Sequence, residues 1–336
     1  MRRARVAVAA AFFVHGAMPG FWAPRIPYIK ANLGLGEGAL GLALLGPAVG
    51  ALGAMLLTGA IIARGGGRTV VRLTLVASCV VLPLPVMAPS FAWLVASLVL
   101  LGACLGAMDV AMNAHGVGLQ HDYGRPLISS FHGMWSLGGF AGALITAGLI
   151  QLGGGPAPHL VGAALVLAIA GLVLTRGLIG DDPNADDSPP GPRFARPTMG
   201  LALLAGLAFC AVFAEGAAHD WSAVYMRESL LASEAVAAGA YATFSLAMAA
   251  GRFSGDRLAL RIGPVPLLRA CGVLAAVGLA FPLLVTRPWA GVVGFGCLGA
   301  GLSCVVPLAF GAAGRAEAGA GPGIASVATA SYTGLL

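Results

Sequence analysis

Two pairs of polar side chains, each four residues apart, interrupt long apolar segments of this chain. Asp109 and Asn113 form the first pair, and Glu215 and His219 form the second, with Ser222 three residues further on. These spacings place side chains on one face of a helix. An ionised side chain within a membrane helix costs about 2.5–3.5 kcal/mol on insertion scales, so it needs a partner or a water-filled cavity. We therefore expect two polar stripes facing a cavity, in which Asp109 and Glu215 bind protons or solute.

Simpler roles for the same residues remain open. Asp109 would also fit a bridge from its helix to a cytoplasmic arginine. Asn113 would fit either a hydrogen bond to a solute hydroxyl or a hydrogen bond between two helices. Histidine titrates near physiological pH, so His132 and His15 could join a proton path, although a lone histidine often serves only packing or hydrogen bonding.

Three further candidates stand near the ends of apolar segments. Arg25 lies between two prolines, where the chain leaves helical geometry. It could close an outer gate against Asp220, bind an anionic group, or simply extend its charge to the membrane surface. Trp221 follows Asp220 and fits either the same gate or an interfacial anchor.

The composition excludes a soluble protein. Hydrophobic residues make up 58% of the 336 residues and charged residues only 10%, and the mean hydropathy is +0.90. A soluble domain carries about 25% charged residues, so lipid must be the solvent for most of this chain. The net charge of +6 comes from short basic groups between apolar runs and not from a basic stripe, which argues against nucleic-acid binding.

The apolar runs predict a polytopic all-α membrane protein in two parts. A hydrocarbon core about 30 Å thick needs about 20 apolar residues of helix. We expect a six-helix bundle over residues 1–179, a cytoplasmic linker over 180–198, and a second bundle over 199–336. The expected spans are 6–29, 39–63, 69–88, 91–118, 129–152, 157–179, 199–226, 235–259, 264–286 and 288–312.

The basic residues predict the orientation of these spans. With the N-terminus inside, most of the 19 lysines and arginines fall on the inner side. Those assigned to the outer side are Arg25, Lys30, Arg227 and Arg287. The positive-inside rule therefore favours a cytoplasmic N-terminus. A last apolar run starts at Ile324 and ends at Leu336. We interpret it as the start of an eleventh helix, so that the second bundle is expected to be truncated.

Two glycine- and arginine-rich segments carry a family resemblance. The segment after the second span contains Gly59, Arg64, Gly66 and Arg68, which match the motif G-x-x-x-D-R-x-G-R-R of the major facilitator superfamily. Ala63 replaces the aspartate of that motif. The resemblance implies two pseudo-symmetric six-helix halves, with these residues in a cytoplasmic gate loop.

The second half contains a related segment, in which Arg252 precedes the acid–base pair Asp256 and Arg257, and the resemblance assigns these three residues to the equivalent gate loop. A narrower likeness covers most of the chain. The segments FWAPRIP, GAMDVAMN, SSFHGMWSLGGFAGA, EGAAHDWS and GRFSGDR resemble a YbjJ-like branch that is itself similar to fucose:proton symporters. Those symporters place an acid four residues before an asparagine, as Asp109 and Asn113 do. The likeness implies a proton-coupled carrier of a small solute in the bacterial inner membrane.

Other functions compete with this one. A multidrug or metabolite exporter of the same fold, or a membrane sensor that does not transport, would share most of these features. An enzyme is not expected, because the six histidines show no HExxH spacing or other metal-ligand pattern. We expect no cofactor, no metal and no nucleic-acid partner, and we expect the protein to act as a monomer.

Overall fold

The computed structural model describes residues 1–124, 127–179 and 199–313, together with residues 327, 330–331 and 333–334. Within these residues the regular structure is entirely helical. The expected linker over 180–198 lies outside the described residues, as does most of the apolar run that starts at Ile324.

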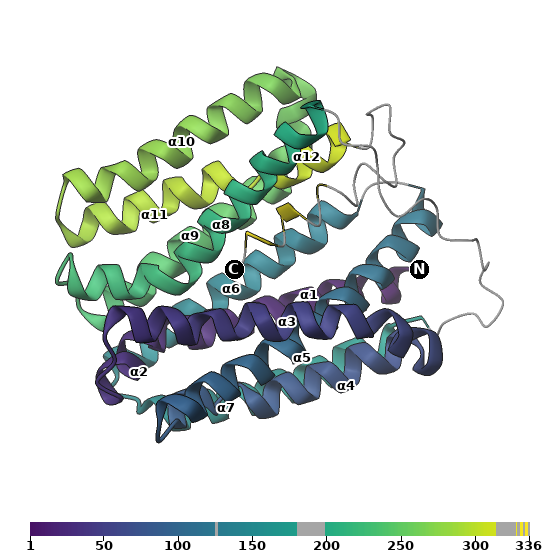
Figure 1. The fold of residues 1–336 in the computed structure, drawn as a ribbon. Helices are drawn as coiled ribbons and strands as arrows, with labels where there is room; N and C mark the ends of the chain where they lie inside the picture. Colours follow the sequence, from purple (N-terminus) through teal and green to yellow (C-terminus); the bar gives the residue numbers. More distant parts are fainter. Residues whose placement is uncertain (125–126, 180–198, 314–326, 328–329, 332, 335–336) are drawn as a thin grey trace.

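The first group of helices occupies the lower part of Figure 1 and ends at η3. It contains α1 (Arg2–Trp22), η1 (Ala23–Arg25), α2 (Ile26–Asn32), α3 (Glu37–Gly65), α4 (Gly67–Val81), η2 (Pro85–Met87), α5 (Phe91–Tyr123), α6 (Ile128–Gln151), α7 (Pro156–Leu174) and η3 (Thr175–Gly177). Local chemistry sets several of these ends. The Ser90 hydroxyl accepts a hydrogen bond from the Trp93 amide and caps α5. Gly124 ends the same helix with φ 63°, which glycine adopts without strain.

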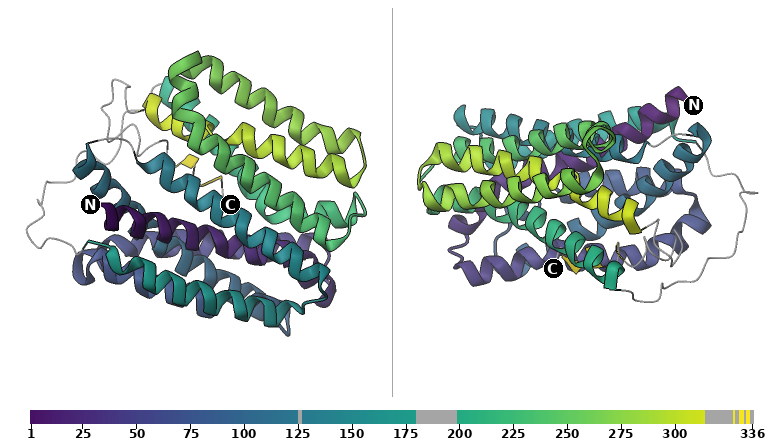
Figure 2. Two further views of the ribbon diagram at one scale, coloured as in Figure 1. Left: turned by 180° about the vertical axis from the view of Figure 1, so that it is seen from behind. Right: turned by 90° about the horizontal axis from the view of Figure 1, so that it is seen from above.

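The second group lies above the first in Figure 1. It contains α8 (Met199–Glu228), α9 (Glu234–Ile262), α10 (Pro264–Leu284), α11 (Pro288–Leu302) and α12 (Val305–Ala313). Ser233 caps α9 by accepting from the Val236 amide. The two views of Figure 2 show the same arrangement of two helix groups from behind and from above.

Nine helical segments of the described chain are long and apolar enough to cross a membrane. The helix α9 has 29 residues, as many as α3, but it is not one of the nine. Its second half carries Arg252, Asp256, Arg257 and Arg261. Because α9 packs between α6 and α11, Arg252 is covered by protein and does not have to face lipid, whereas Asp256, Arg257 and Arg261 are exposed near the end of the helix.

The turns between α3 and α4 and between α9 and α10 are each a single glycine with positive φ, Gly66 at 79° and Gly263 at 87°. Such a turn needs no further loop residues. The helices therefore continue through the motifs that we had assigned to gate loops. Gly59 and Arg64 lie in α3, and Arg68 lies in α4.

The helix α6 connects the two groups, since it packs against α1 on one side and α9 on the other. Glycines allow both contacts. A methyl group added at Gly138 would lie 2.0 Å from the carbonyl oxygen of Phe13 in α1, and one at Gly139 would lie 3.2 Å from the Ser245 hydroxyl in α9. Small residues at such crossings let helix backbones approach closely. This packing brings the polar residues of α6, α8 and α9 together.

Candidate functional site

Arg252 is the centre of a polar cluster that joins the two helix groups. Its Nη2 donates to both carboxylate oxygens of Glu215 in α8, at 3.1 and 3.3 Å. Its Nη1 donates to the Ser136 hydroxyl in α6 at 2.6 Å, and its guanidinium carbon lies 5.6 Å from the centre of the Trp135 ring. The side chains of Arg252 and Glu215 are only 11% and 16% exposed. Arg252 therefore lies in the interior of α9 and not in a cytoplasmic loop, which corrects its predicted location.

His15 in α1 holds Trp135 from the other side. The indole Nε1 of Trp135 donates to His15 Nδ1 at 2.7 Å, and His15 Nε2 lies 3.1 Å from the carbonyl oxygen of Leu105 in α5. Because an indole N–H can only donate, Nδ1 must be the acceptor and Nε2 must carry the hydrogen. Both ring nitrogens of a neutral imidazole are thus used. In this arrangement His15 positions Trp135 and has no free nitrogen to accept a proton.

His219 lies on the opposite side of the indole. Its ring stacks on Trp135 with centroids 5.5 Å apart and planes at 11°, and its Nδ1 lies 3.3 Å from the Tyr241 hydroxyl. Tyr241 is 1% exposed, so its hydroxyl hydrogen needs an acceptor. His219 Nδ1 and the Ser245 side chain both lie beside it, and we assign the hydrogen to Nδ1. The hydrogen of the neutral His219 ring is then on Nε2. Among the described residues, His219 Nε2 and the hydroxyl of Ser222 are buried without a hydrogen-bond partner.

The first polar pair approaches this cluster from α5. The Asn113 side-chain nitrogen donates to Asp109 Oδ1 at 3.1 Å and to the Asp109 carbonyl at 2.9 Å. Asp109 lies one turn after Leu105, whose carbonyl contacts His15, and its charge acts on the His15 ring. The two stripes predicted from spacing thus reach the same region from α5 and α8.

His132 lies one turn before Ser136 on α6. Its ring meets the edge of Phe12 at 5.2 Å, and the charges of both Arg252 and Glu215 act on it. His132 therefore borders the ion pair, although the described contacts of its ring are with an aromatic side chain.

Arg25 has a different partner from the one expected. It is 3% exposed and contacts His159 Nδ1 through Nε at 3.4 Å and the Gly154 carbonyl through Nη2 at 3.3 Å. Both partners belong to the first helix group, in the first turn of α7 and just before it. The expected pairing of Arg25 with Asp220 is therefore wrong as a contact in this structure. The fold of the 3-10 turn η1 directs the guanidinium inward, toward α7.

A different ion pair joins the two groups at the ends of α2 and α8. Lys30 at the end of α2 donates to Glu228 at the end of α8, at 2.6 Å to Oε1. Trp221 lies nearby in the contact between the groups, because a methyl added at Gly41 in α3 would be 3.5 Å from its ring. Asp220 is partly buried in α8, and the described residues offer it no hydrogen-bond or ion-pair partner.

The remaining predicted residues lie near the helix ends that meet at Gly66 and Gly263. Asp256 and Arg257 are exposed on α9. A cavity of about 20 Å³ lies between Arg252 and this end of α9. Ser129, Asp256, Ser303 and Cys304 contribute its polar lining. That volume is enough for about one water molecule. The cluster around Arg252 therefore borders a small polar cavity.

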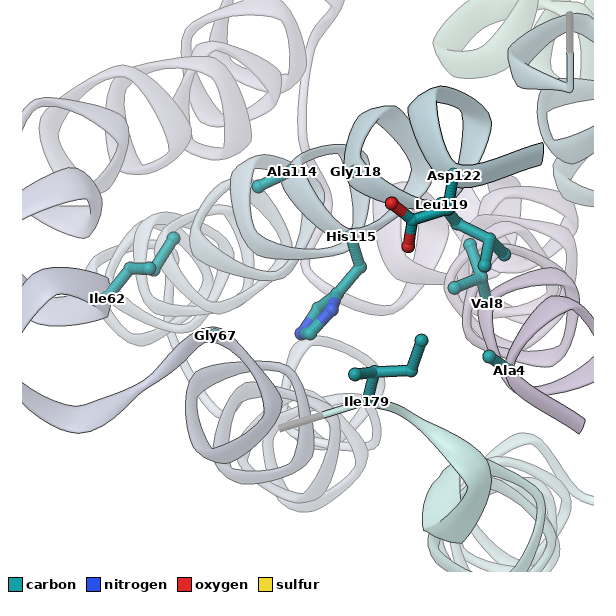
Figure 3. Close-up of a pocket in the computed structure, with 10 residues that line it drawn as sticks. All are labelled: Ala4, Val8, Ile62, Gly67, Ala114, His115, Gly118, Leu119, Asp122 and Ile179. Atoms are coloured by element: carbon teal, nitrogen blue, oxygen red, sulfur yellow. The ribbon is translucent and has the colours of Figure 1, made fainter. Parts of the chain in front are cut away.

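A larger cavity of about 200 Å³ lies within the first group and not between the groups. Figure 3 shows its lining, with His115 and Asp122 projecting from α5 toward residues of α1, α3 and α4. Neither side chain contacts the cluster around Arg252 in the described structure. In the described part of the chain, no group of three or more His, Cys, Asp or Glu side chains could hold a metal ion.

Comparison with known proteins now decides the family. The family model of the Major Facilitator Superfamily matches residues 8–335. The chain belongs to the Major Facilitator Superfamily. Its fold is the major facilitator fold, and it is a multi-pass membrane transporter and not an enzyme.

Curated relatives cover nearly the whole chain. An uncharacterized MFS-type transporter of Yersinia pestis is 34% identical over 333 residues, which is 99% of this chain and 86% of that protein. An uncharacterized transporter, y4wD, of Sinorhizobium fredii is 32% identical and covers 97% of this chain and 86% of its own length. The membrane protein MosC of Rhizobium meliloti is 33% identical over 98% of this chain and 80% of its own.

Solved structures share the fold at low sequence identity. A bacterial homologue of the human lysosomal transporter Spinster, inward-facing and occupied, has a TM-score of 0.67 at 15% identity, with 98% of this chain and 78% of that chain covered. The human organic anion transporter MFSD10 has a TM-score of 0.68 at 16% identity, with 99% and 90% covered. These major facilitator structures support the fold alone.

Proposed function

We propose that this major facilitator protein moves a small polar solute across the bacterial inner membrane together with a proton, by alternating access. The observation that carries the proposal is the Glu215–Arg252 pair. It is mostly buried and bridges α8 and α9 of the second group to Ser136 on α6 of the first. An intramembrane acid whose ion-pair partner contacts the other half can link its protonation to the relative position of the halves.

Protonation would change the cluster in a defined way. A proton on Glu215 removes the negative charge that offsets Arg252, and a buried charge without a partner is strongly unfavourable. The Arg252 guanidinium must then find another anion or water, and its bond to Ser136 is one of the contacts that join the halves. Asp109 in α5 contributes a second acid, which accepts a hydrogen bond from Asn113 and whose charge acts on His15.

The two ends of the molecule would act as gates. Lys30 and Glu228 join the halves at the end that the charge distribution assigns to the outside, with Trp221 packed nearby. The exposed arginines at the ends of α3 and α9 then lie on the cytoplasmic side, together with the N-terminus. We propose that the outer contact opens as the cluster around Arg252 changes partners, in a protein that works as a monomer.

Reconstitution tests this proposal. Proteoliposomes containing a trapped pH-sensitive dye are challenged with neutral, anionic and cationic metabolites, and proton uptake is recorded after each addition. The wild-type protein should acidify the lumen with at least one solute. The variants Glu215→Gln and Asp109→Asn should each abolish solute-driven proton uptake, because a side-chain amide does not bind a proton near neutral pH.

A matched substitution controls for general damage. Glu37→Gln replaces an exposed glutamate in the first turn of α3 and should leave proton uptake unchanged. If no solute in the panel moves protons, or if Glu215→Gln keeps full coupling, proton-coupled transport through this pair is refuted.

A further inference from the structure

We infer that the transported solute is a small organic acid, carried as its carboxylate with one proton. This inference rests on the proposed function and adds the charge class of the substrate. It starts from the partners of Arg252. Ser136 and the Trp135 ring are neutral and hold the guanidinium whatever the protonation state, whereas Glu215 is its charged partner among the described residues.

A proton on Glu215 would leave the contacts of Arg252 with Ser136 and Trp135 intact, but would remove the anionic partner of Arg252. The guanidinium would stay between Ser136 and Trp135, with the Nη2 hydrogens that now contact Glu215 free. A planar fork of N–H groups matches the two oxygens of a carboxylate, as Glu215 shows in this structure. A solute carboxylate would therefore take the place of the Glu215 carboxylate.

The charges balance in this exchange. One proton binds a Glu215 oxygen, and one carboxylate forms hydrogen bonds to Arg252, so the net charge of the cluster does not change. No covalent bond forms or breaks. Binding of the proton and of the solute anion would favour each other, because the ionised Glu215 competes with the solute for the same donors.

His219 supplies an additional donor at the same place. It lies four residues from Glu215 on one face of α8, and the charges of the two residues interact. Its Nε2–H is buried without a partner, as is the Ser222 hydroxyl on the same face. An organic acid with a hydroxyl group would satisfy both. Asp220 is turned by about 100° from this stripe and takes no part in it.

The other charge classes fit less well. A neutral sugar brings no anion for Arg252 once Glu215 is protonated, and an amine would meet a like charge. The titratable groups that face Glu215 are Arg252 and Tyr241 from α9, His132 from α6 and His219 from its own helix. His132 in turn faces His15 of α1.

Binding to matched triads of solutes tests the inference on the purified, full chain. Each triad keeps one carbon skeleton and changes only the charge. The triads are lactate, propane-1,2-diol and 1-amino-2-propanol; gluconate, sorbitol and glucamine; and glucuronate, glucose and 6-amino-6-deoxyglucose. At least one carboxylate should bind while its neutral and amino counterparts do not. Its Kd should rise by up to about tenfold per pH unit above the titration of Glu215, as expected for one linked proton.

Variants separate the recognition of charge from structural damage. Glu215→Gln imitates the protonated acid, so it should bind the carboxylate at least as tightly as the wild type, with a Kd that no longer depends on pH. Arg252→Gln should weaken binding by about 10- to 100-fold, the range for loss of hydrogen bonds to a charged group. Arg252→Lys, which keeps the charge without the fork, should also weaken it. Arg261→Gln removes an exposed arginine from the same helix and should change nothing.

The failures of the two proposals are distinguishable. A neutral or amino solute that binds without its carboxylate counterpart, or a panel with no binding member, overturns the inference. If a neutral solute drives proton uptake, proton coupling stands and the charge class is wrong. If a carboxylate binds at Arg252 but drives no proton uptake, the charge class stands and proton coupling fails.

Discussion

The Glu215–Arg252 pair allows a quantitative prediction about folding stability. Breaking a buried pair by removing one partner costs about 3–5 kcal/mol, because the other charge is left uncompensated. Both side chains retain slight exposure, 16% and 11%, so we expect the lower end of that range for Arg252→Gln. In Glu215→Gln the amide oxygen still accepts from the guanidinium, and the expected loss is about 2 kcal/mol.

The double variant Glu215→Gln/Arg252→Gln should lose less folding stability than the two single variants lose in sum. With both charges gone, no isolated ion remains, and the cost should fall to about 1–2 kcal/mol, that of two imperfect neutral hydrogen bonds. The predicted interaction energy of the cycle is therefore about 3 kcal/mol.

Equilibrium unfolding in mixed micelles, with increasing fractions of sodium dodecyl sulfate, would measure the four proteins. Helicity by circular dichroism and tryptophan fluorescence would report unfolding. An interaction energy below about 0.5 kcal/mol, the usual scatter for independent sites, would refute the reasoning, because it would mean that the two charges do not depend on each other in the folded protein.

Two further predictions concern the packing of the halves and the outer contact. Gly138→Ala places a methyl 2.0 Å from the Phe13 carbonyl oxygen and should destabilise the folded protein by about 1–3 kcal/mol through overpacking. The control Gly148→Ala, in the same helix, meets open space and should be neutral in the same unfolding assay. Equal effects of the two variants would disprove the close contact of α1 and α6. Lys30→Glu should oppose two acids at the outer end and shift the closed-to-open ratio by up to about fivefold, the upper end for an exposed pair. This would appear as faster labelling of Gly41→Cys by a membrane-impermeant thiol reagent, and Lys30→Glu/Glu228→Lys should restore the slow rate. A labelling rate that ignores both changes would exclude this pair from the outer gate.

The positions of the helices could be predicted from the sequence because lipid imposes a simple rule. Backbone polar groups in hydrocarbon must be satisfied internally, so a run of about 20 apolar residues becomes a helix. The expected span 129–152 corresponds to α6 (Ile128–Gln151), and 91–118 corresponds to the first part of α5 (Phe91–Tyr123). The extension of α5 to Tyr123 was missed because its last turns are polar and do not depend on lipid.

Membership of the Major Facilitator Superfamily was also predictable from short motifs and is confirmed by the family model. The polar stripes of α5 and α8 could be recognised because a spacing of four residues is a property of any helix. Tyr241 was missed. It lies among alanines near the start of α9 with no local sign of function, and only its contact with His219 reveals it.

Which residues meet across the molecule was decided by the tertiary structure. Arg252 resembled a gate-loop residue in the sequence, yet the one-residue turn at Gly263 keeps it within α9, opposite Glu215 and Ser136. Arg25 lies against His159 and not against Asp220, because η1 turns it toward α7. Helical periodicity determines which side chains share a face of one helix. The rotation and closeness of one helix against another depend on the glycine contacts of α6 with α1 and α9, and these bring together residues more than 100 positions apart.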